Sequence, residues 1–175
     1  MKFTRTEIRD LVIIEPDIFE DERGYFFESF RQDQFEREIG KIDFVQENES
    51  FSQYGVLRGL HYQIPPYEQS KLVRVVLGRV QDIAVDLRKE SPTFGKHFSI
   101  ELSNENRKQL FIPKGFAHGY LALSKEVVFI YKTDNYYSKE HESGILWNSK
   151  NLGIDWSIKA DIMLSEKDAT LKSFK

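Results

Sequence analysis

Two of the four histidines in this chain lie in contexts that suit proton-transfer chemistry. The four are His61, His97, His118 and His141. His61 ends the run GVLRGLH at residues 55–61, and His118 ends the run PKGFAH at residues 113–118. Both runs combine a glycine turn with a candidate strand, and imidazole is the side chain best matched to proton transfer near neutral pH. His61 and His118 are therefore the first candidate site residues.

The same two spacings, G-x5-H and P-x-G-x2-H, resemble the two halves of the cupin signature. Cupins are small β jelly rolls with a site inside the barrel. Metal-binding cupins have a second histidine two residues after the first, and this chain has Gln63 at that place. No glutamate fits the later ligand position, where Lys71 stands. Ligand number and charge are both too low for a divalent metal, so we expect no metal and look to acid–base chemistry.

Short strands must position these residues. One clear helix is predicted at 32–39, with Phe35 and Ile39 on one face and Gly40 as its stop. The tail after Trp156 is expected to pack across the barrel as a short helix. Strand-like runs separated by turn signals fill most of the remaining chain: 11–14, 25–30, 44–46, 56–60, 71–77, 79–87, 97–102, 109–112, 119–123 and 127–133. This pattern predicts an all-β, cupin-type jelly-roll barrel with a few short flanking helices, in one domain spanning residues 1–175.

Alternation along two of these strands predicts which side chains share a face. In the run 127–133, Phe129 and Tyr131 lie on the same face. In the run 80–87, Asp82 lies on the face opposite Ile83 and Val85. Asp82 is thus a candidate polar group on the inner side of the barrel.

Composition excludes several classes of protein. The chain of 175 residues carries a net charge of −3, which gives no support for a nucleic-acid binder. Its apolar runs are far too short to span a membrane, and no secretory signal is visible. It contains no cysteine, which excludes disulfides and a cysteine nucleophile and fits a cytoplasmic location.

Nine segments, in order over nearly the whole chain, resemble the dTDP-4-dehydrorhamnose 3,5-epimerase family. Single motifs of this kind are weak evidence, but the ordered set is specific. The segments are FEDERGYFFESF (19–30), FVQENES (44–50), GVLRGLHYQ (55–63), SKLVRVVLGRVQDIAVDLRKESPTFG (70–95), IPKGFAHGYLALS (112–124), YKTDNYYS (131–138), ILWN (145–148), LGIDW (152–156) and LSEKDA (164–169).

The resemblance implies a reaction as well as a fold. An enzyme of this family would act on dTDP-4-dehydro-6-deoxy-D-glucose, which is a dTDP-linked 4-keto-6-deoxyhexose. The product would be dTDP-4-dehydro-L-rhamnose, the precursor of dTDP-L-rhamnose. The C4 ketone acidifies the C–H bonds at C3 and C5. Inversion then needs a base on one face, an acid on the other, and stabilisation of the enolate oxygen. No cofactor is needed, and the chain contains no G-x-G-x-x-G fingerprint.

The resemblance also assigns catalytic roles. His61 matches the base and Asp168 the carboxylate that orients it. Tyr131 matches the proton donor, and Lys71 matches the residue beside the keto oxygen of the sugar. From the residues alone, Asp82 remains a rival partner for His61, because a tail aspartate such as Asp168 could equally be a solvated surface group.

The remaining positions carried by the resemblance bind substrate. Arg23 and Arg58 match residues that meet the diphosphate, where arginine can make bidentate contacts. The family implies a homodimer in which N-terminal segments cross over, so that Arg23 and Glu28 act in the neighbouring subunit's pocket. The full set of matched binding residues is Phe19, Arg23, Glu28, Gln46, Asn48, Arg58, His118, Tyr137, Glu142 and Lys167.

Three other hypotheses stay open on the sequence. A related epimerase could invert only C3 or only C5, or could use another nucleotide, with most of the same residues. A non-catalytic sugar-binding cupin would not need both His61 and Tyr131 as base and acid. A metal-dependent cupin oxygenase is the last alternative, and it would need the metal ligands that the sequence lacks.

Overall fold

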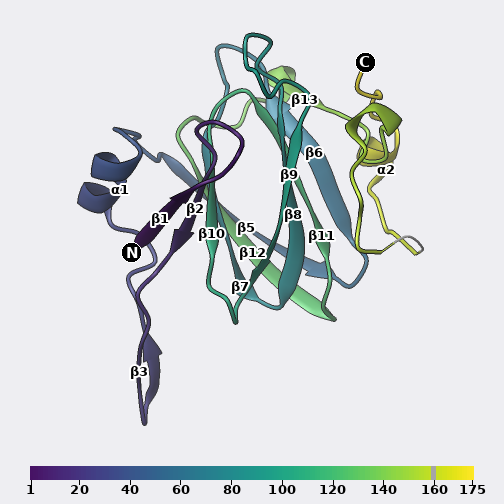
Figure 1. The fold of residues 1–175 in the computed structure, drawn as a ribbon. Helices are drawn as coiled ribbons and strands as arrows, with labels where there is room; N and C mark the ends of the chain where they lie inside the picture. Colours follow the sequence, from purple (N-terminus) through teal and green to yellow (C-terminus); the bar gives the residue numbers. More distant parts are fainter. Residues whose placement is uncertain (159–160) are drawn as a thin grey trace.

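The computed structural model describes residues 1–158 and 161–175, and most of its regular structure is β-strand (Figure 1). The helices are α1 (Gln32–Glu38) and α2 (Glu166–Ala169), with 3-10 turns at Lys139–His141 and Lys150–Leu152. None of the described helices is long and apolar enough to cross a membrane. The strands are β1 (Lys2–Arg5), β2 (Val12–Glu15), β3 (Phe19–Asp21), β4 (Gly24–Phe26), β5 (Gln46–Gln53), β6 (Leu57–Gln63), β7 (Lys71–Leu77), β8 (Arg79–Asp86), β9 (His97–Ser103), β10 (Gln109–Ile112), β11 (Phe116–Ala122), β12 (Glu126–Thr133) and β13 (Glu142–Gly144).

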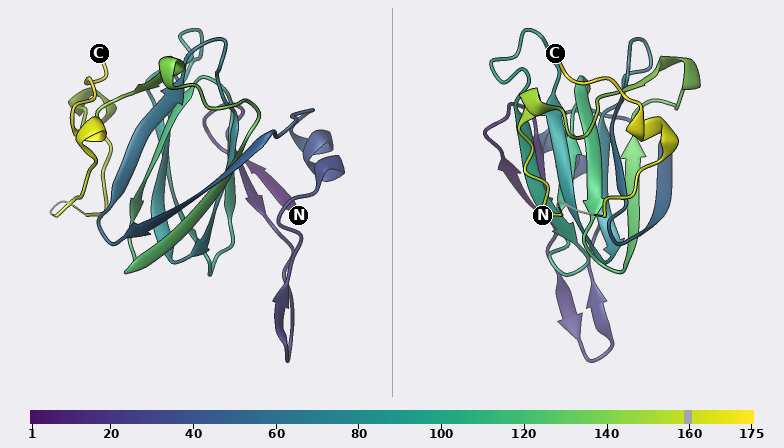
Figure 2. Two further views of the ribbon diagram at one scale, coloured as in Figure 1. Left: turned by 180° about the vertical axis from the view of Figure 1, so that it is seen from behind. Right: turned by 90° about the vertical axis from the view of Figure 1, so that its right-hand side faces the viewer.

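Two antiparallel sheets face each other. In the described residues one sheet has the order β1-β2-β10-β7-β12-β5, and the other has the order β13-β6-β11-β8-β9. Figure 2 shows the sheets packed face to face, with the C-terminal tail outside one of them and α1 outside the other. This arrangement confirms the predicted all-β, cupin-like fold with short flanking helices.

Strand β8 shows why the strands carry so many apolar residues. Val80 and Ala84 point into the core between the sheets, while Ile83 and Val85 pack beneath the C-terminal tail. Both faces of this strand are therefore covered. This explains why nearly all of its residues are buried, where a strand with one exposed face would alternate between buried and exposed residues. The predicted inner position of Asp82 holds, because it lies on the same side as Val80 and Ala84.

Helix α1 covers the outer face of the larger sheet. Its Phe35 is fully buried and packs edge-on against Phe44 and Phe111. The predicted helix at 32–39 is confirmed, ending one residue early at Glu38. Gly40 follows with φ of +125°, a conformation that favours glycine at a helix stop.

The sequence misjudged several strand limits. Strand β5 was expected only at 44–46, yet it runs over Gln46–Gln53, whose sequence QENESFSQ is mainly polar. Strands β1, β3 and β13 were not predicted, and the strand expected at 25–30 ends at Phe26. Strand β11 begins at Phe116, so His118 lies inside a strand and not in the turn before it.

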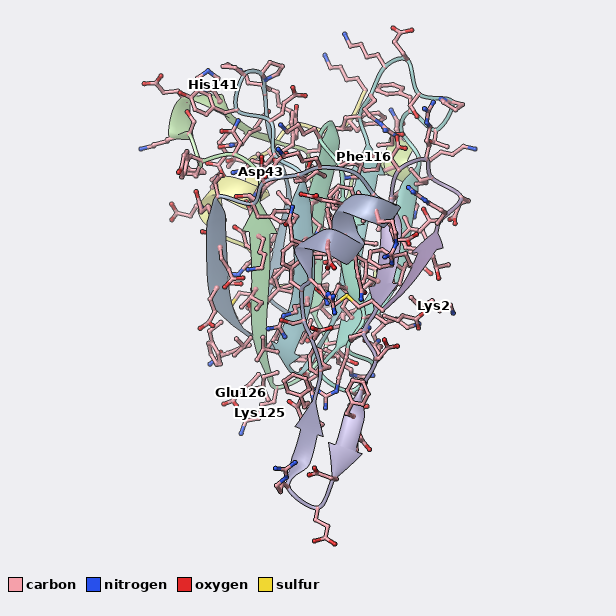
Figure 3. The ribbon with its side chains drawn as sticks, turned by 90° about the vertical axis from the view of Figure 1, so that its left-hand side faces the viewer. Lys2, Asp43, Phe116, Lys125, Glu126 and His141 are labelled. Carbon is pink, nitrogen blue, oxygen red and sulfur yellow. The ribbon has the colours of Figure 1, made fainter. Side chains whose placement is uncertain are left out.

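The β3–β4 hairpin projects away from the sheets (Figure 1). Figure 3 shows it extending past the end of the molecule at which Lys125 and Glu126 are labelled. The hairpin turns at residues 21–24, with Gly24 at φ of +122°. Phe19 and Phe26 on this hairpin are 63% and 66% exposed, so one chain leaves these large apolar side chains uncovered.

Candidate functional site

A cavity of about 550 Å³ lies between the two sheets and beneath the C-terminal tail. Nine of the predicted site residues line it: Arg58, His61, Lys71, His118, Tyr131, Tyr137, Glu142, Lys167 and Asp168. The cavity is thus the place where most of the predicted chemistry comes together. It is large enough for part of a small organic ligand.

His61 and Asp168 form a short hydrogen-bonded pair at one wall. His61 Nε2 and Asp168 Oδ1 are 2.6 Å apart, although the residues are 107 positions apart in sequence. The side chain of Ser165 caps α2 by accepting from the Asp168 amide, which fixes the start of this short helix. Burial opposes ionisation of Asp168, but hydrogen bonds from His61 and from the Gly59 amide hold its pKa below the ordinary value.

The tautomer of His61 follows from this pair. An ionised carboxylate only accepts hydrogen bonds, so Nε2 of His61 carries a proton and donates it. Nδ1 then carries the lone pair that can accept a proton. The Asp168 carboxylate can also stabilise the imidazolium that forms.

Close approach of two strands places the two histidines side by side. In the register between β6 and β11, His61 lies opposite His118. A Cβ on Gly119 would lie 2.6 Å from the Arg58 carbonyl oxygen, and a Cβ on Gly59 would lie 2.6 Å from Gly119 Cα. Only glycine therefore permits this spacing between the strands.

Asp82 partners His118 and not His61. His118 Nε2 lies 2.9 Å from Asp82 Oδ2, and both side chains are buried. Burial lowers the pKa of His118, against the attraction of the Asp82 carboxylate. Of the two candidate carboxylates, Asp168 is therefore the one that bonds to His61.

Lys71 adds a partly buried cation to the cavity. Its Nζ lies 3.5 Å from the main-chain oxygen of His61, and no carboxylate among the described residues is within 4 Å of it. Burial lowers the pKa of Lys71 to about 8, against the charges of Asp82 and Glu142. An ammonium in this position can stabilise negative charge that develops on a ligand oxygen.

Tyr131 approaches the cavity from the opposite sheet. It lies on β12, opposite Asn48 of β5, whereas His61 lies on β6 of the other sheet. Burial raises the pKa of Tyr131, and the nearby Tyr120 raises it further. A neutral hydroxyl and an imidazole therefore face one cavity from opposite walls.

The outer part of the cavity carries charged and amide groups. Tyr137 donates from its hydroxyl to Glu142 at 2.8 Å, and Lys167 pairs with the same carboxylate. Gln46 accepts from the Tyr137 amide at 3.1 Å and donates to Asn48 at 2.8 Å. Gln46 and Asn48 do not line the cavity themselves, but they support residues that do.

Three predicted binding residues lie away from this cavity. Phe19 and Arg23 stand on the projecting hairpin, where Arg23 pairs with Asp21. Glu28 follows that hairpin and its carboxylate lies 3.7 Å from Arg31. Within one chain, these residues make no part of the site.

Several lining residues were not predicted as ligands. Ser50, Tyr120, Phe129, Gln63 and Gln69 also line the cavity. Tyr120 stacks on Phe129 with ring centroids 4.3 Å apart. The alternation of residues along β5, with serines at positions 50 and 52 on one face, is the sequence pattern that could have predicted a polar inner face for this strand.

Within the part of the chain that the structure describes, no group of three or more His, Cys, Asp or Glu side chains could hold a metal ion. The two site histidines are instead each bonded to one carboxylate.

Comparison with known proteins gives one consistent result. Residues 5–175 match the family model described as dTDP-4-dehydrorhamnose 3,5-epimerase. The protein of that name from Shigella flexneri is 55% identical over 99% of this chain and 96% of its own length. The crystal structure of the Elizabethkingia anophelis NUHP1 protein of that name has a TM-score of 0.96 and 52% identity, covering 99% of this chain and 96% of that one. A Legionella pneumophila dTDP-6-deoxy-D-glucose-3,5-epimerase, solved with dTDP-4-keto-L-rhamnose, has a TM-score of 0.95 and 48% identity, covering 98% and 92%. The chain belongs to the dTDP-4-dehydrorhamnose 3,5-epimerase family of isomerases.

Proposed function

We propose that this protein inverts C3 and C5 of dTDP-4-dehydro-6-deoxy-D-glucose to give dTDP-4-dehydro-L-rhamnose. The observation that carries the proposal is the pair of proton-transfer groups on opposite walls of one cavity. His61, bonded to Asp168, lies on one sheet, and Tyr131 lies on the other. Inversion of a carbon next to a ketone needs a base and an acid on opposite faces.

The proposed sequence of steps uses these groups and no cofactor. Nδ1 of His61 takes the proton from the carbon beside the C4 ketone. The electron pair moves to the C4 oxygen, and the Lys71 ammonium stabilises the resulting enolate. The Tyr131 hydroxyl then returns a proton to the opposite face of the same carbon. The second centre is inverted in the same way, after the base and the acid have been reset by solvent.

The diphosphate and nucleoside would occupy the outer part of the cavity. Arg58 and Lys167 supply positive charge there, and arginine can bind a phosphate through two N–H groups. Tyr137 offers an aromatic face next to them. His118, Gln46, Asn48 and Glu142 complete the proposed contacts or hold those contacts in place.

We further propose that the active assembly is a homodimer in which the β3–β4 hairpin serves the neighbouring cavity. The support is that Phe19 and Arg23 lie on the β3–β4 hairpin, which projects past the sheets (Figure 3), and that neither they nor Glu28 line the cavity of their own chain. Exposed apolar side chains on this hairpin suit contact with a second copy. One domain over residues 1–175 and a cytoplasmic location also belong to the proposal. The family match over residues 5–175 and the cysteine-free composition support them.

Solvent exchange tests the reaction directly. The protein would be incubated with dTDP-4-keto-6-deoxyglucose in D₂O, and deuterium at each carbon measured by mass spectrometry and NMR. Uptake at both C3 and C5 with inversion is expected. Uptake at one carbon would indicate a single-centre epimerase, and no uptake would favour a binding protein or another nucleotide sugar.

Subunit complementation tests the hairpin. A His61→Ala protomer and an Arg23→Ala protomer would each be nearly inactive alone. After co-refolding, the mixed dimer should regain activity, because one of its two cavities then holds both intact groups. Failure of the mixture to recover activity, with mixed dimers shown to form, would contradict a shared site.

A further inference from the structure

The inner wall of the cavity holds a chain of hydrogen bonds that ends on Arg58. In the register between β6 and β11, Arg58 lies opposite Tyr120, so both side chains enter the cavity on the same face. Ser52 links them. Arg58 donates from Nε to Ser52 Oγ at 3.0 Å, and Ser52 Oγ lies 3.0 Å from the Tyr120 hydroxyl.

One arrangement of protons satisfies every contact in this chain. A serine hydroxyl has one proton to donate, and Ser50 Oγ lies 3.4 Å from the carbonyl oxygen of Phe129, which can only accept it. With the Ser50 proton on that carbonyl oxygen, the Tyr120 hydroxyl, 2.9 Å from Ser50 Oγ, donates to Ser50. Its oxygen is then free to accept from Ser52, and Ser52 in turn accepts from Arg58. All the bonds run one way, from the guanidinium to a main-chain carbonyl of β12.

Such a chain ties a mobile side chain to both sheets. Arg58 belongs to β6 and Tyr120 to β11 of one sheet, while the two serines belong to β5 of the other. Ser52 is 2% exposed, and Tyr120 is held from its other side by the stacked ring of Phe129. Bonds in one direction polarise each other, so the guanidinium is held more firmly than by one bond alone.

The geometry leaves the outward part of the guanidinium free for a ligand. Arginine has five N–H donors. One on Nε goes to Ser52, and one on Nη2 goes to the Phe51 carbonyl oxygen at 2.9 Å. The two on Nη1 and the second on Nη2 have no partner among the described residues. No carboxylate of the described chain forms an ion pair with Arg58 within 4 Å, so its charge is available to an anion.

We propose that the Tyr120 hydroxyl is a positioning group for Arg58, which it holds through Ser52 in the orientation that binds the diphosphate of the substrate. This inference rests on the proposed function, and it adds a residue that touches neither the reacting carbons nor the phosphates. Phenylalanine at position 120 would keep the ring and its stacking on Phe129 but would lose the central link of the chain.

Binding of dTDP provides the first test, because it needs no turnover. The affinities of dTDP and of thymidine would be measured by calorimetry for the wild-type protein and for Tyr120→Phe. Loss of one net hydrogen bond predicts dTDP binding weaker by about threefold to tenfold. Thymidine has no phosphate, so its affinity should not change. Tyr54→Phe is the matched control, since Tyr54 is 54% exposed in the turn between β5 and β6.

A double-mutant cycle separates positioning from a general loss of structure. In an Arg58→Gln background, Tyr120→Phe should have no further effect on dTDP affinity, because the group that it positions is already gone. Ser52→Ala should reproduce the effect of Tyr120→Phe by a different route. In turnover, both variants should raise KM by the same factor, as expected for loss of substrate binding.

The outcomes are distinct. Unchanged dTDP affinity in Tyr120→Phe, an equal loss of thymidine affinity, or additive effects with Arg58→Gln would each overturn the inference while the proposed function stands. Failure of the folded wild-type protein to bind dTDP would overturn both. Weaker dTDP binding that disappears in the Arg58→Gln background supports the inference.

Discussion

Replacement of Asp168 by asparagine tests the proposed base more sharply than removal of His61. Asparagine has nearly the same shape, so it can still accept from His61 Nε2, but it carries no charge. The structure places the carboxylate oxygen 2.6 Å from the ring nitrogen in a site where Asp168 is 3% exposed. The change therefore removes the charge that would stabilise the imidazolium formed during proton abstraction.

The magnitude follows from the separation of the two charges. The charges are spread over the ring and the carboxylate, so their centres are about 4 Å apart, and at an effective dielectric constant of 20 they interact by about 4 kcal/mol. A loss of that size at the transition state slows proton abstraction by about a thousandfold, since each 1.36 kcal/mol is worth about a factor of ten. The affinity for dTDP should stay unchanged, because Asp168 lies at the proposed reacting end of the cavity.

The assay is the rate of deuterium uptake at C3 and C5 under saturating substrate. Glu166→Gln is the matched control, because Glu166 is an exposed carboxylate on the same short helix, two residues from Asp168. Thermal unfolding of both variants would show that the fold is retained. If Asp168→Asn exchanges deuterium within tenfold of the wild-type rate, the charge of Asp168 does not assist the base and the proposed dyad is wrong.

Three further predictions concern other groups. Burial lowers the pKa of Lys71 to about 8, so kcat/KM should fall as the pH rises above about 8 and the ammonium loses its proton. If the pH profile of Lys71→Gln shows the same fall above pH 8, the fall belongs to another group. Tyr131→Phe should lower the rate of inversion by about a hundredfold or more, the usual size of a lost general acid. His61 still deprotonates the substrate in this variant, so deuterium uptake without inversion should continue; inversion at the wild-type rate would exclude Tyr131 as the donor. Burial opposes ionisation of Asp86, but hydrogen bonds, chiefly from Arg88, lower its pKa to about 2. Because the pKa of Asp86 is lower in the folded protein than in the unfolded chain, its carboxylate stabilises the fold above pH 4 by about 2 kcal/mol, and this contribution is lost as the pH falls towards 2. Chemical denaturation should therefore show that Asp86→Asn loses less stability than the wild-type protein over this pH range.

The sequence predicts those parts of the fold that carry apolar patterning. The runs that became β7, β8 and β12 were placed almost to the residue, because each is a run rich in apolar, mostly β-branched residues of strand length. Strand β5 was missed for the opposite reason. Its inner face holds Ser50, which lines the cavity, and Ser52, which is buried and bonds Tyr120 and Arg58. Polar residues that serve the site therefore stand where apolar residues would have signalled a strand.

Pairing of site residues could not be predicted from local patterns. Period-two alternation placed Asp82 on the inner face correctly, but it could not say which histidine Asp82 would meet. The answer depends on how β8, β11 and β6 line up: β11 lies between the other two strands, with His118 opposite His61 on β6 and Ala84 on β8. Asp82, two residues from Ala84, then reaches His118 and not His61. Family resemblance supplied the role of Asp168, which no periodicity on the four-residue helix α2 could have indicated.

The same pairing explains why the proposed base depends on the whole chain. The core between the sheets contains no described side chain of the C-terminal tail, whose apolar side chains pack outside the smaller sheet. His61 lies on β6 of that sheet, and its partner Asp168 is supplied by the docked tail. Docking also buries the carboxylate and closes one side of the cavity with Leu164 and Ser165. The step that orients the imidazole is therefore the same step that shields it from solvent, which couples the strength of the base to the closure of the site.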